Sequence, residues 1–464
     1  MFKKTLKQML AVAAALTLAG CAGQAGSGAA APATQAASAA GETAAQGAAT
    51  QGATTGAPSA TTGAPAAEPE VIKIGFLTPL SGGNATYGIQ CKEAGQMIAD
   101  IINEAHPELA MLLAEQAGLP NLNGARIELV VADHKSDPTV ATSEAKRLIT
   151  EENVVAITGQ YTSSITKAVA VVTENYEIPL LTAGSSPSLT APETGLEWYF
   201  RFGPNDTYYI RDSFEFIKKL NEEKGAGFKT VAFVSEDTEF GANIALEEVR
   251  FAEEYGFEVV ANITYSASAT NVSAEVMKVK AANPDVIMMS SYAADAILYL
   301  KTFKEQNYVP KMLLGQRGGF VQTDFLDTMG LDTEYIFTTG GWSADIDNET
   351  SKQMIELYKE YTPDGAELSE GHCKDMINVL LIALAINQAG TTESKALQAA
   401  LRNLDADTSR MPIPWDAITM DEYGQNTSAN AFVLQRKDGV YQTVYPAEYA
   451  ALESIIPMPA WSER

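Results

Sequence analysis

Two serine-bearing turns are the segments best suited to hold a small charged molecule. Ser163 and Ser164 follow Gly159, which closes an apolar run, and they open a run with helical periodicity. The first N–H groups and the positive dipole end of a helix attract anions, and a serine hydroxyl adds a donor. A second such turn follows the next apolar run and holds Gly184, Ser185 and Ser186. The two turns therefore predict an anion site. The alternative is that Ser163 only caps the helix that follows.

Residues for catalysis or metal binding are sparse. The three histidines, His106, His134 and His372, form no pair at metal-ligand spacing. The sequence contains no Gly-x-Ser-x-Gly elbow and no phosphate-binding Gly-x-x-x-x-Gly-Lys loop. We therefore expect no enzyme, no cofactor and no metal site. A surface hydrolase that uses a serine of these turns stays open as an alternative.

Apolar runs that alternate with amphipathic runs position these turns. Strands are predicted at Val71–Leu77, Arg126–Ala132, Val154–Thr158, Pro179–Thr182, Thr230–Val234, Phe257–Tyr265, Val286–Ser290, Lys311–Gly315 and Tyr335–Gly340. Helices are predicted at Tyr87–Asn103, Thr139–Glu151, Ser163–Tyr176, Asp206–Leu220, Gly241–Tyr255, Asn271–Ala282 and Ala293–Glu305. Three further helices reach Arg402, and a β-rich tail spans Ala431–Tyr445. Continuous apolar strands between helices indicate parallel sheets, so the predicted fold class is α/β with two Rossmann-like lobes.

The start of the chain has the composition of a processing segment. Three lysines precede a short apolar run from Met9 to Leu18, which is the layout of a secretory signal peptide and too short for a permanent membrane span. Residues 22–69 consist almost entirely of small and polar residues, which predicts a disordered tether. We expect a signal peptide at 1–20, a tether at 21–69 and a globular body from residue 71.

Charge and cysteine content narrow the class further. The 464-residue chain has 58 Asp and Glu against 32 Lys and Arg, a net charge of −26, which argues against nucleic-acid binding. The roughly 395 residues after the tether are too many for one ordinary core and suggest two domains. Beyond Cys21, only Cys91 and Cys373 remain; two distant thiols are more often packed than paired, although pairing stays open.

Short segments along the whole body resemble a known family. In chain order they are Lys73–Gly82 with Tyr87-Gly88, Asp133 with Asp137-Pro138, Ile157–Ser164, Ile178–Ser186, Arg201, Asp237–Gly241, Tyr292 and Gly315–Gly318. The series resembles type I periplasmic binding proteins, and among them the branched-chain amino acid receptors of ABC transporters. The tetrad Leu18–Cys21 resembles the lipobox of bacterial lipoproteins, in which the cysteine becomes the first mature residue and carries the lipid.

The resemblance implies two lobes joined by three crossings, with a small molecule held between them. Lobe one would comprise 71–207 and 341–430, and lobe two 208–340 and 431–464. It also implies an extracytoplasmic monomer that delivers an amino acid or organic acid to a membrane permease and touches the membrane only through lipidated Cys21. A sensory module that reports to a receptor or kinase is the rival function.

The resemblance also assigns residues to the site. Ser163 and Ser164, with the turn of Gly184, Ser185 and Ser186, would hold the ligand carboxylate, and Tyr87, Tyr292 and Phe240 would line the cleft. The departure is Arg317, which stands where amino-acid receptors carry an acid for the ligand ammonium. A guanidinium cannot accept a hydrogen bond. Either another acid takes this role, namely Asp206, Asp295 or Asp345, or the ligand lacks an amine and Arg317 binds a second carboxylate.

Overall fold

The first half of the body forms a parallel sheet between two layers of helices. The computed structural model describes residues 69–363 and 365–464. The five strands run in the order β2-β1-β3-β4-β5 and are all parallel. Their bounds are β1 (Val71–Thr78), β2 (Arg126–Asp133), β3 (Ile157–Thr158), β4 (Leu180–Leu181) and β5 (Tyr199–Phe200). Helix α2 (Ala85–Asn103) packs on one face, and α3 (Pro138–Thr150) and α4 (Ser163–Tyr176) pack on the other.

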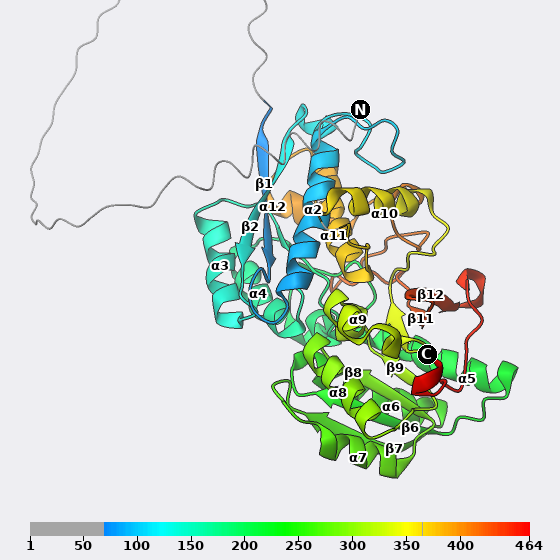
Figure 1. The fold of residues 1–464 in the computed structure, drawn as a ribbon. Helices are drawn as coiled ribbons and strands as arrows, with labels where there is room; N and C mark the ends of the chain where they lie inside the picture. The colour runs from blue at the N-terminus through cyan, green and yellow to red at the C-terminus, as the bar shows by residue number, and fades with distance from the viewer. Residues whose placement is uncertain (1–68, 364) are drawn as a thin grey trace, which may run out of the picture. The chain divides into compact units, whose positions relative to one another are not determined.

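A second sheet of seven strands forms the other lobe (Figure 1). Its order is β12-β11-β10-β9-β8-β6-β7, and only β11 and β12 are antiparallel to their neighbours. The strands are β6 (Thr230–Glu236), β7 (Glu258–Tyr265), β8 (Val286–Ser290), β9 (Leu313–Gly315), β10 (Phe337–Gly340), β11 (Phe432–Lys437) and β12 (Val440–Tyr445). Helices α5 (Asp206–Lys224) and α6 (Glu239–Tyr255) cover one face, whereas α7 (Ser273–Ala282), α8 (Ala293–Glu305) and α9 (Thr323–Met329) cover the other.

Three helices then return to the five-stranded sheet. They are α10 (Glu349–Tyr361), α11 (Glu370–Ala389) and α12 (Ser394–Arg402). Helix α11 packs along α2 and is buried over almost its whole length, as expected of a helix that is apolar on all sides. The chain thus passes between the sheets after β5, after β10 and before β11. These passages confirm the predicted α/β fold with two lobes and three crossings, which we name the five-stranded and the seven-stranded lobe.

The structure refines the predicted elements. Helices α4 and α8 have the predicted bounds, whereas β3 and β4 are only two residues long. The sequence pattern predicts neither β5 nor α9, because both are too short to show a periodicity. Cys91 and Cys373 are buried free thiols, which confirms the expectation that they are packed and unpaired. The exact lobe boundaries at 207, 340 and 430 stay a prediction.

The predicted signal peptide, lipid anchor and tether fall on the start of the chain. The signal peptide, Cys21 and the tether through residue 68 lie outside the described residues. Among the residues that are described, no helix has the length and apolar character needed to cross a bilayer.

Core packing by α11 gives a first prediction. Leu381 is 0 % exposed, so Leu381→Ala should lower the free energy of unfolding by about 2–5 kcal/mol through lost burial and the cavity left behind. Leu246 on α6 is 71 % exposed, so the matched Leu246→Ala should change it by less than about 0.5 kcal/mol. Urea unfolding followed by circular dichroism measures both. Equal losses in the two variants would contradict the central position of α11.

Candidate functional site

The first serine turn lies at the carboxyl end of β3, where α/β sheets bind ligands. Thr162 is the N-cap of α4 and its side chain makes no capping hydrogen bond. Ser163 is the first helical residue, so the alternative role as a helix cap is wrong for it. Ser163 is 2 % exposed and lines a cavity between the lobes. The start of α4 therefore directs a hydroxyl and the positive end of the helix dipole toward this cavity.

The second serine turn is held in place by a buried arginine. Arg201, 1 % exposed, donates hydrogen bonds from Nη1 to the carbonyl oxygens of Gly184 (3.1 Å) and Ser186 (2.7 Å). Ser185 lies between these two anchored residues and lines the cavity, whereas Gly184 and Ser186 do not. The carbonyl oxygen of Ser185 accepts a hydrogen bond from the N–H of Asp206 (2.9 Å). This turn thus joins the five-stranded lobe to the start of α5.

Aromatic rings form a continuous wall across the two lobes. Tyr87 and Tyr161 from the five-stranded lobe have ring centroids 4.0 Å apart. Tyr161 meets Tyr292 of the seven-stranded lobe at 5.6 Å, and Tyr292 meets Phe240 at 5.4 Å. All four line the cavity. Such a wall offers flat apolar surface for the body of a small ligand.

Arg317 lies in a tight turn after β9 with an unfavourable backbone conformation. Its φ of 50° and ψ of −113° belong to a region that normally requires glycine. Gly319 makes the turn fit against α8, since a Cβ there would lie 2.2 Å from the carbonyl carbon of Tyr292. Holding a non-glycine residue in such a conformation costs about 1–3 kcal/mol, and such strain clusters at functional sites. The turn brings the guanidinium to the cavity.

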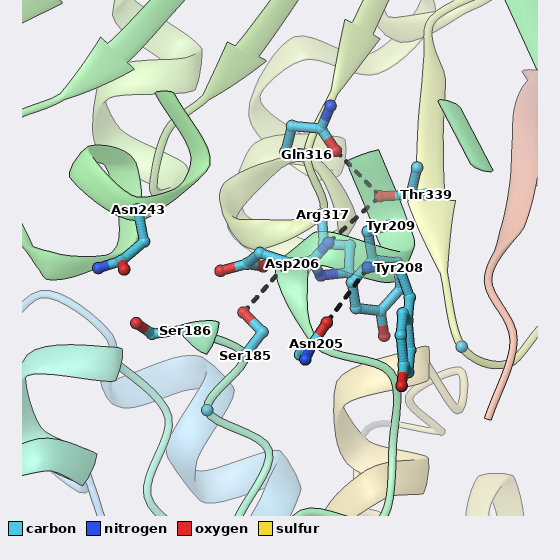
Figure 2. A network of polar contacts seen from close by, with 12 residues as sticks. Ser185, Ser186, Asn205, Asp206, Tyr208, Tyr209, Asn243, Gln316, Arg317 and Thr339 are labelled. Atoms are coloured by element: carbon cyan, nitrogen blue, oxygen red, sulfur yellow. Dashed lines mark hydrogen bonds and ion pairs between the residues drawn. The ribbon is translucent and has the colours of Figure 1, made fainter. Parts of the chain in front are cut away.

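Figure 2 shows the contacts that hold Arg317. Its Nη2 donates to Asp206 Oδ1 at 2.5 Å and to Ser185 Oγ at 3.0 Å, and its Nη1 lies 3.4 Å from Thr339 Oγ1. The guanidinium also stacks 3.6 Å from the ring centroid of Tyr209. Arg317 is therefore neutralised by Asp206 in a buried ion pair. Asp206 Oδ2 is buried and has no hydrogen-bond partner among the described residues.

A second buried ion pair comes from the start of α11. Lys374 Nζ lies 2.5 Å from Glu370 Oε1, and both residues line the cavity. The Tyr209 hydroxyl lies 3.0 Å from Glu370 Oε1 and 2.9 Å from Lys374 Nζ, so it links the two ion pairs. Burial opposes ionisation of Glu370, but Lys374 and Arg317 outweigh it and hold the pKa of this carboxyl below its usual range. The four charges of the site sum to zero.

The cavity itself is small in this structure. Its volume is about 40 Å³, which is enough for a few water molecules. It is lined by Tyr87, Tyr161, Ser163, Ala183, Ser185, Phe240, Tyr292, Arg317, Gly318, Val321, Glu370, Gly371 and Lys374. Six of the nine ligand residues predicted from the sequence are in this set, whereas Ser164, Gly184 and Ser186 are not. An occupant the size of an amino acid requires the lobes to separate.

The structure also sorts the acids proposed to replace the missing carboxylate. Asp295 is bonded to the Tyr265 hydroxyl, and Asp345 accepts hydrogen bonds from Ser343 and Thr443. None of the three acids lines the cavity, but Asp206 is bonded to Arg317, which does. In the described part of the chain, no group of three His, Cys, Asp or Glu side chains is placed to hold a metal ion.

Seven lining residues are absent from the sequence-based assignment, and three of them have polar side chains: Tyr161, Glu370 and Lys374. Tyr161 lies inside the motif that carries the resemblance, so its aromatic ring next to Ser163 was a usable signal. Glu370 and Lys374 have i,i+4 spacing, which is also the spacing of an ordinary exposed helix pair. Nothing in the sequence distinguishes their burial at the cleft from that common case.

A buried acid beside the aromatic wall gives a prediction for pH. Burial raises the pKa of Asp375, next to Cys91, to about 7. Because the folded protein holds this proton more tightly than the unfolded chain, stability falls as pH rises from about 4 to about 7. Asp375→Asn does not titrate, so its melting temperature relative to the parent should be higher at pH 8 than at pH 5.

The control for this measurement is Asp405→Asn, on the exposed segment after α12. Differential scanning calorimetry of both variants at the two pH values separates the effect of Asp375 from that of every other titrating group. A difference between Asp375→Asn and the parent that is the same at pH 5 and pH 8 would show that the carboxyl is not protonated in the folded state.

Two curated relatives match nearly the whole body. The Leu/Ile/Val-binding protein homolog 7 of Brucella suis biovar 1 (strain 1330) is 27% identical over 397 residues, which cover 83% of this chain and 94% of the relative. The Leu/Ile/Val-binding protein homolog 8 of Brucella abortus (strain 2308) is 26% identical over 385 residues, which cover 82% and 91%.

Solved structures share the fold. A leucine-binding protein LivK of Thermotoga maritima MSB8 has a TM-score of 0.67 at 21% identity and covers 80% of this chain and 97% of its own. LivJ of Streptococcus pneumoniae, in complex with isoleucine, has a TM-score of 0.67 at 22% identity and covers 81% and 100%. A solute-binding protein of Rhodopseudomonas palustris BisB5, in complex with 3,4-dihydroxybenzoic acid, has a TM-score of 0.66 at 18% identity and covers 85% and 99%.

The family profile described as periplasmic binding protein matches residues 71–439. This match extends over most of the chain and agrees with the two-lobed fold, the cleft and the relatives. The resemblance noted in the sequence is thereby confirmed. The chain belongs to the periplasmic binding protein family, as an extracytoplasmic solute receptor of the kind that serves branched-chain amino acid ABC transporters.

Proposed function

We propose that the receptor binds an amino acid in the cavity between its lobes and delivers it to an ABC-transporter permease. The observation that carries this proposal is Ser163 at the uncapped start of α4, buried and facing a wall of aromatic rings. The hydroxyl and the helix start suit a carboxylate. The rings Tyr87, Tyr161 and Tyr292 suit an apolar side chain.

The charges of the site favour a zwitterion over a dicarboxylate. Arg317 is already neutralised by Asp206, and Lys374 by Glu370. A dianion would add two negative charges to this neutral and buried site, which is costly unless both are paired. A zwitterion adds none. Asp206 Oδ2 is buried next to Arg317 without a partner among the described residues, and it is the acceptor we assign to the ligand ammonium when the lobes separate. Arg317 then orients Asp206 and does not grip a second carboxylate.

We further propose that Cys21 carries a lipid and that residues 22–69 tether the body to the membrane surface, with the receptor acting as a monomer. The basis is the sequence alone: a basic and apolar leader, the tetrad that ends at Cys21 and the small-residue composition that follows. The family's extracytoplasmic location is consistent with this attachment.

A thermal-shift screen tests the ligand class. Aliphatic and aromatic amino acids, their amides, the matching monocarboxylates and dicarboxylates are added to the purified protein. A ligand that binds only the folded state should stabilise it by about 2.7 kcal/mol at a hundredfold excess over its dissociation constant. We expect the shift with amino acids and a loss of about tenfold in affinity in Ser163→Ala, because one hydrogen bond to a charged group is removed.

The matched control is Ser273→Ala, which removes the hydroxyl of the first residue of α7, away from the cavity. It should bind as the parent does. If dicarboxylates raise the melting temperature and amino acids do not, the role given to Asp206 is contradicted. Arg317 would then be the residue that binds a second carboxylate of the ligand. If no compound shifts the melting temperature, a sensory or protein-binding role is favoured. Capture of a kinase in place of a permease would establish that role.

A further inference from the structure

A second and larger cavity lies beside the ligand cavity. Its volume is about 580 Å³, within the usual range for small-molecule sites. Val321 and Glu370 contribute to the walls of both cavities. The remaining walls come from α2, α9, α11 and the β11–β12 hairpin, all labelled in Figure 1, and from the segments that follow β10 and precede α11. The closed arrangement that reduces the ligand cavity to about 40 Å³ leaves this one open.

The walls of this second cavity are mixed, and their apolar part includes two flat rings. Trp342, 3 % exposed, lies in the segment that leaves β10, and Leu434 on β11 is 4 % exposed. Leu326 on α9, Leu368 before α11 and Tyr441 on β12 complete the apolar surface. An indole and a phenol ring on opposite elements suit a flat apolar body.

One half-buried cation in this cavity has no counter-charge among the described residues. Arg436 on β11 forms no ion pair and donates no side-chain hydrogen bond to any residue that the structure describes. Its Nε is buried and unpartnered, and its guanidinium lies 5.7 Å from the ring centroid of Tyr441. By contrast, the buried Arg201 and Arg317 each have several acceptors. In a chain with 58 acids and 32 basic residues, a half-buried guanidinium whose Nε is buried without an acceptor is free to pair with an anionic ligand.

The acids around this cavity limit the charge of the occupant. Asp327 and Glu367 also line it, but both are exposed at its rim, and Glu370 is paired with Lys374. Two rim carboxylates repel a dianion, whereas a single carboxylate at Arg436 can be shielded by the apolar walls. We propose that this cavity is a second binding site, for a flat apolar monocarboxylate whose carboxylate pairs with Arg436.

The position of this site couples it to the lobes. Gln90 on α2 accepts a hydrogen bond from Thr323 on α9 (3.2 Å) at its edge, so the five-stranded and seven-stranded lobes both contribute walls. A molecule that touches both lobes favours the lobe arrangement in which it binds, and by linkage it changes the affinity of a first-cavity ligand that requires a different arrangement. The second site depends on its own walls and not on which molecule fills the first.

Fluorine NMR of the full chain labelled with 5-fluorotryptophan tests this proposal. The chain has four tryptophans, of which Trp342 lines the second cavity and none lines the ligand cavity. Trp342→Phe assigns its resonance. The probes are 2-naphthoate, indole-3-acetate and benzoate, with the matching amides. We expect the acids to shift the Trp342 resonance saturably and the amides to bind at least about tenfold more weakly, because the charged pair is lost.

Variants of Arg436 then separate charge from folding. Arg436→Gln should weaken the acids by at least about tenfold, and Arg436→Lys should keep part of the affinity through its charge. Arg126→Gln, on the exposed start of β2, is the matched control and should bind as the parent does. Amides that bind as well as acids, or acids that bind Arg436→Gln unchanged, would overturn the anion site. No Trp342 shift up to about 10 mM of any probe, equivalent to a binding free energy weaker than about −3 kcal/mol, would overturn the cavity as a site. Neither result depends on Ser163 or on the amino-acid screen.

Discussion

The buried ion pair between Arg317 and Asp206 is the constraint on which the site depends. A guanidinium that is 4 % exposed must have its charge balanced, and removing one partner of such a pair typically costs about 3–5 kcal/mol. The first turn of α5 supplies the balance, because Asn205 caps this helix and Asp206 follows immediately. Tyr209, one turn later, then lies under the guanidinium and bonds to Glu370 and Lys374. The start of α5 therefore organises residues from both lobes.

The same pair explains how an arginine can stand where amino-acid receptors have an acid. With Asp206 bound to it, Arg317 adds no net positive charge, and the carboxylate of Asp206 keeps one oxygen without a partner among the described residues. Under the proposed function, the ligand ammonium would then bind an acid of α5 and not an acid of the turn after β9. The strained backbone of Arg317 is tolerated because Gly318 and Gly319 pack closely against Ser291 and Tyr292.

The fold was largely predictable from the sequence, and the site was predictable in part. Continuous apolar runs located β1, β6 and β8 because those strands are buried on both faces. The serine turns were found because helix starts at strand ends have a local signature. The pairing of Arg317 with Asp206 was beyond reach, since 111 residues separate them and either side chain alone fits a surface position. Likewise, the sequence does not show that Arg436 lacks an ion pair, because the distance from Arg436 to each acid is fixed only when the chain folds.

The narrowness of the ligand cavity has a kinetic consequence. Contacts between the lobes close its surroundings, including Tyr161 with Gln322, Gln90 with Thr323 and the ion pair of Lys167 with Glu239. These contacts must break before a molecule the size of an amino acid can enter the cavity. The rate of binding is then limited by how often the lobes separate, and not by the strength of any single contact to the ligand. A substitution at the rim, far from the bound molecule, can therefore change the rate of binding while leaving every atom that touches the ligand in place.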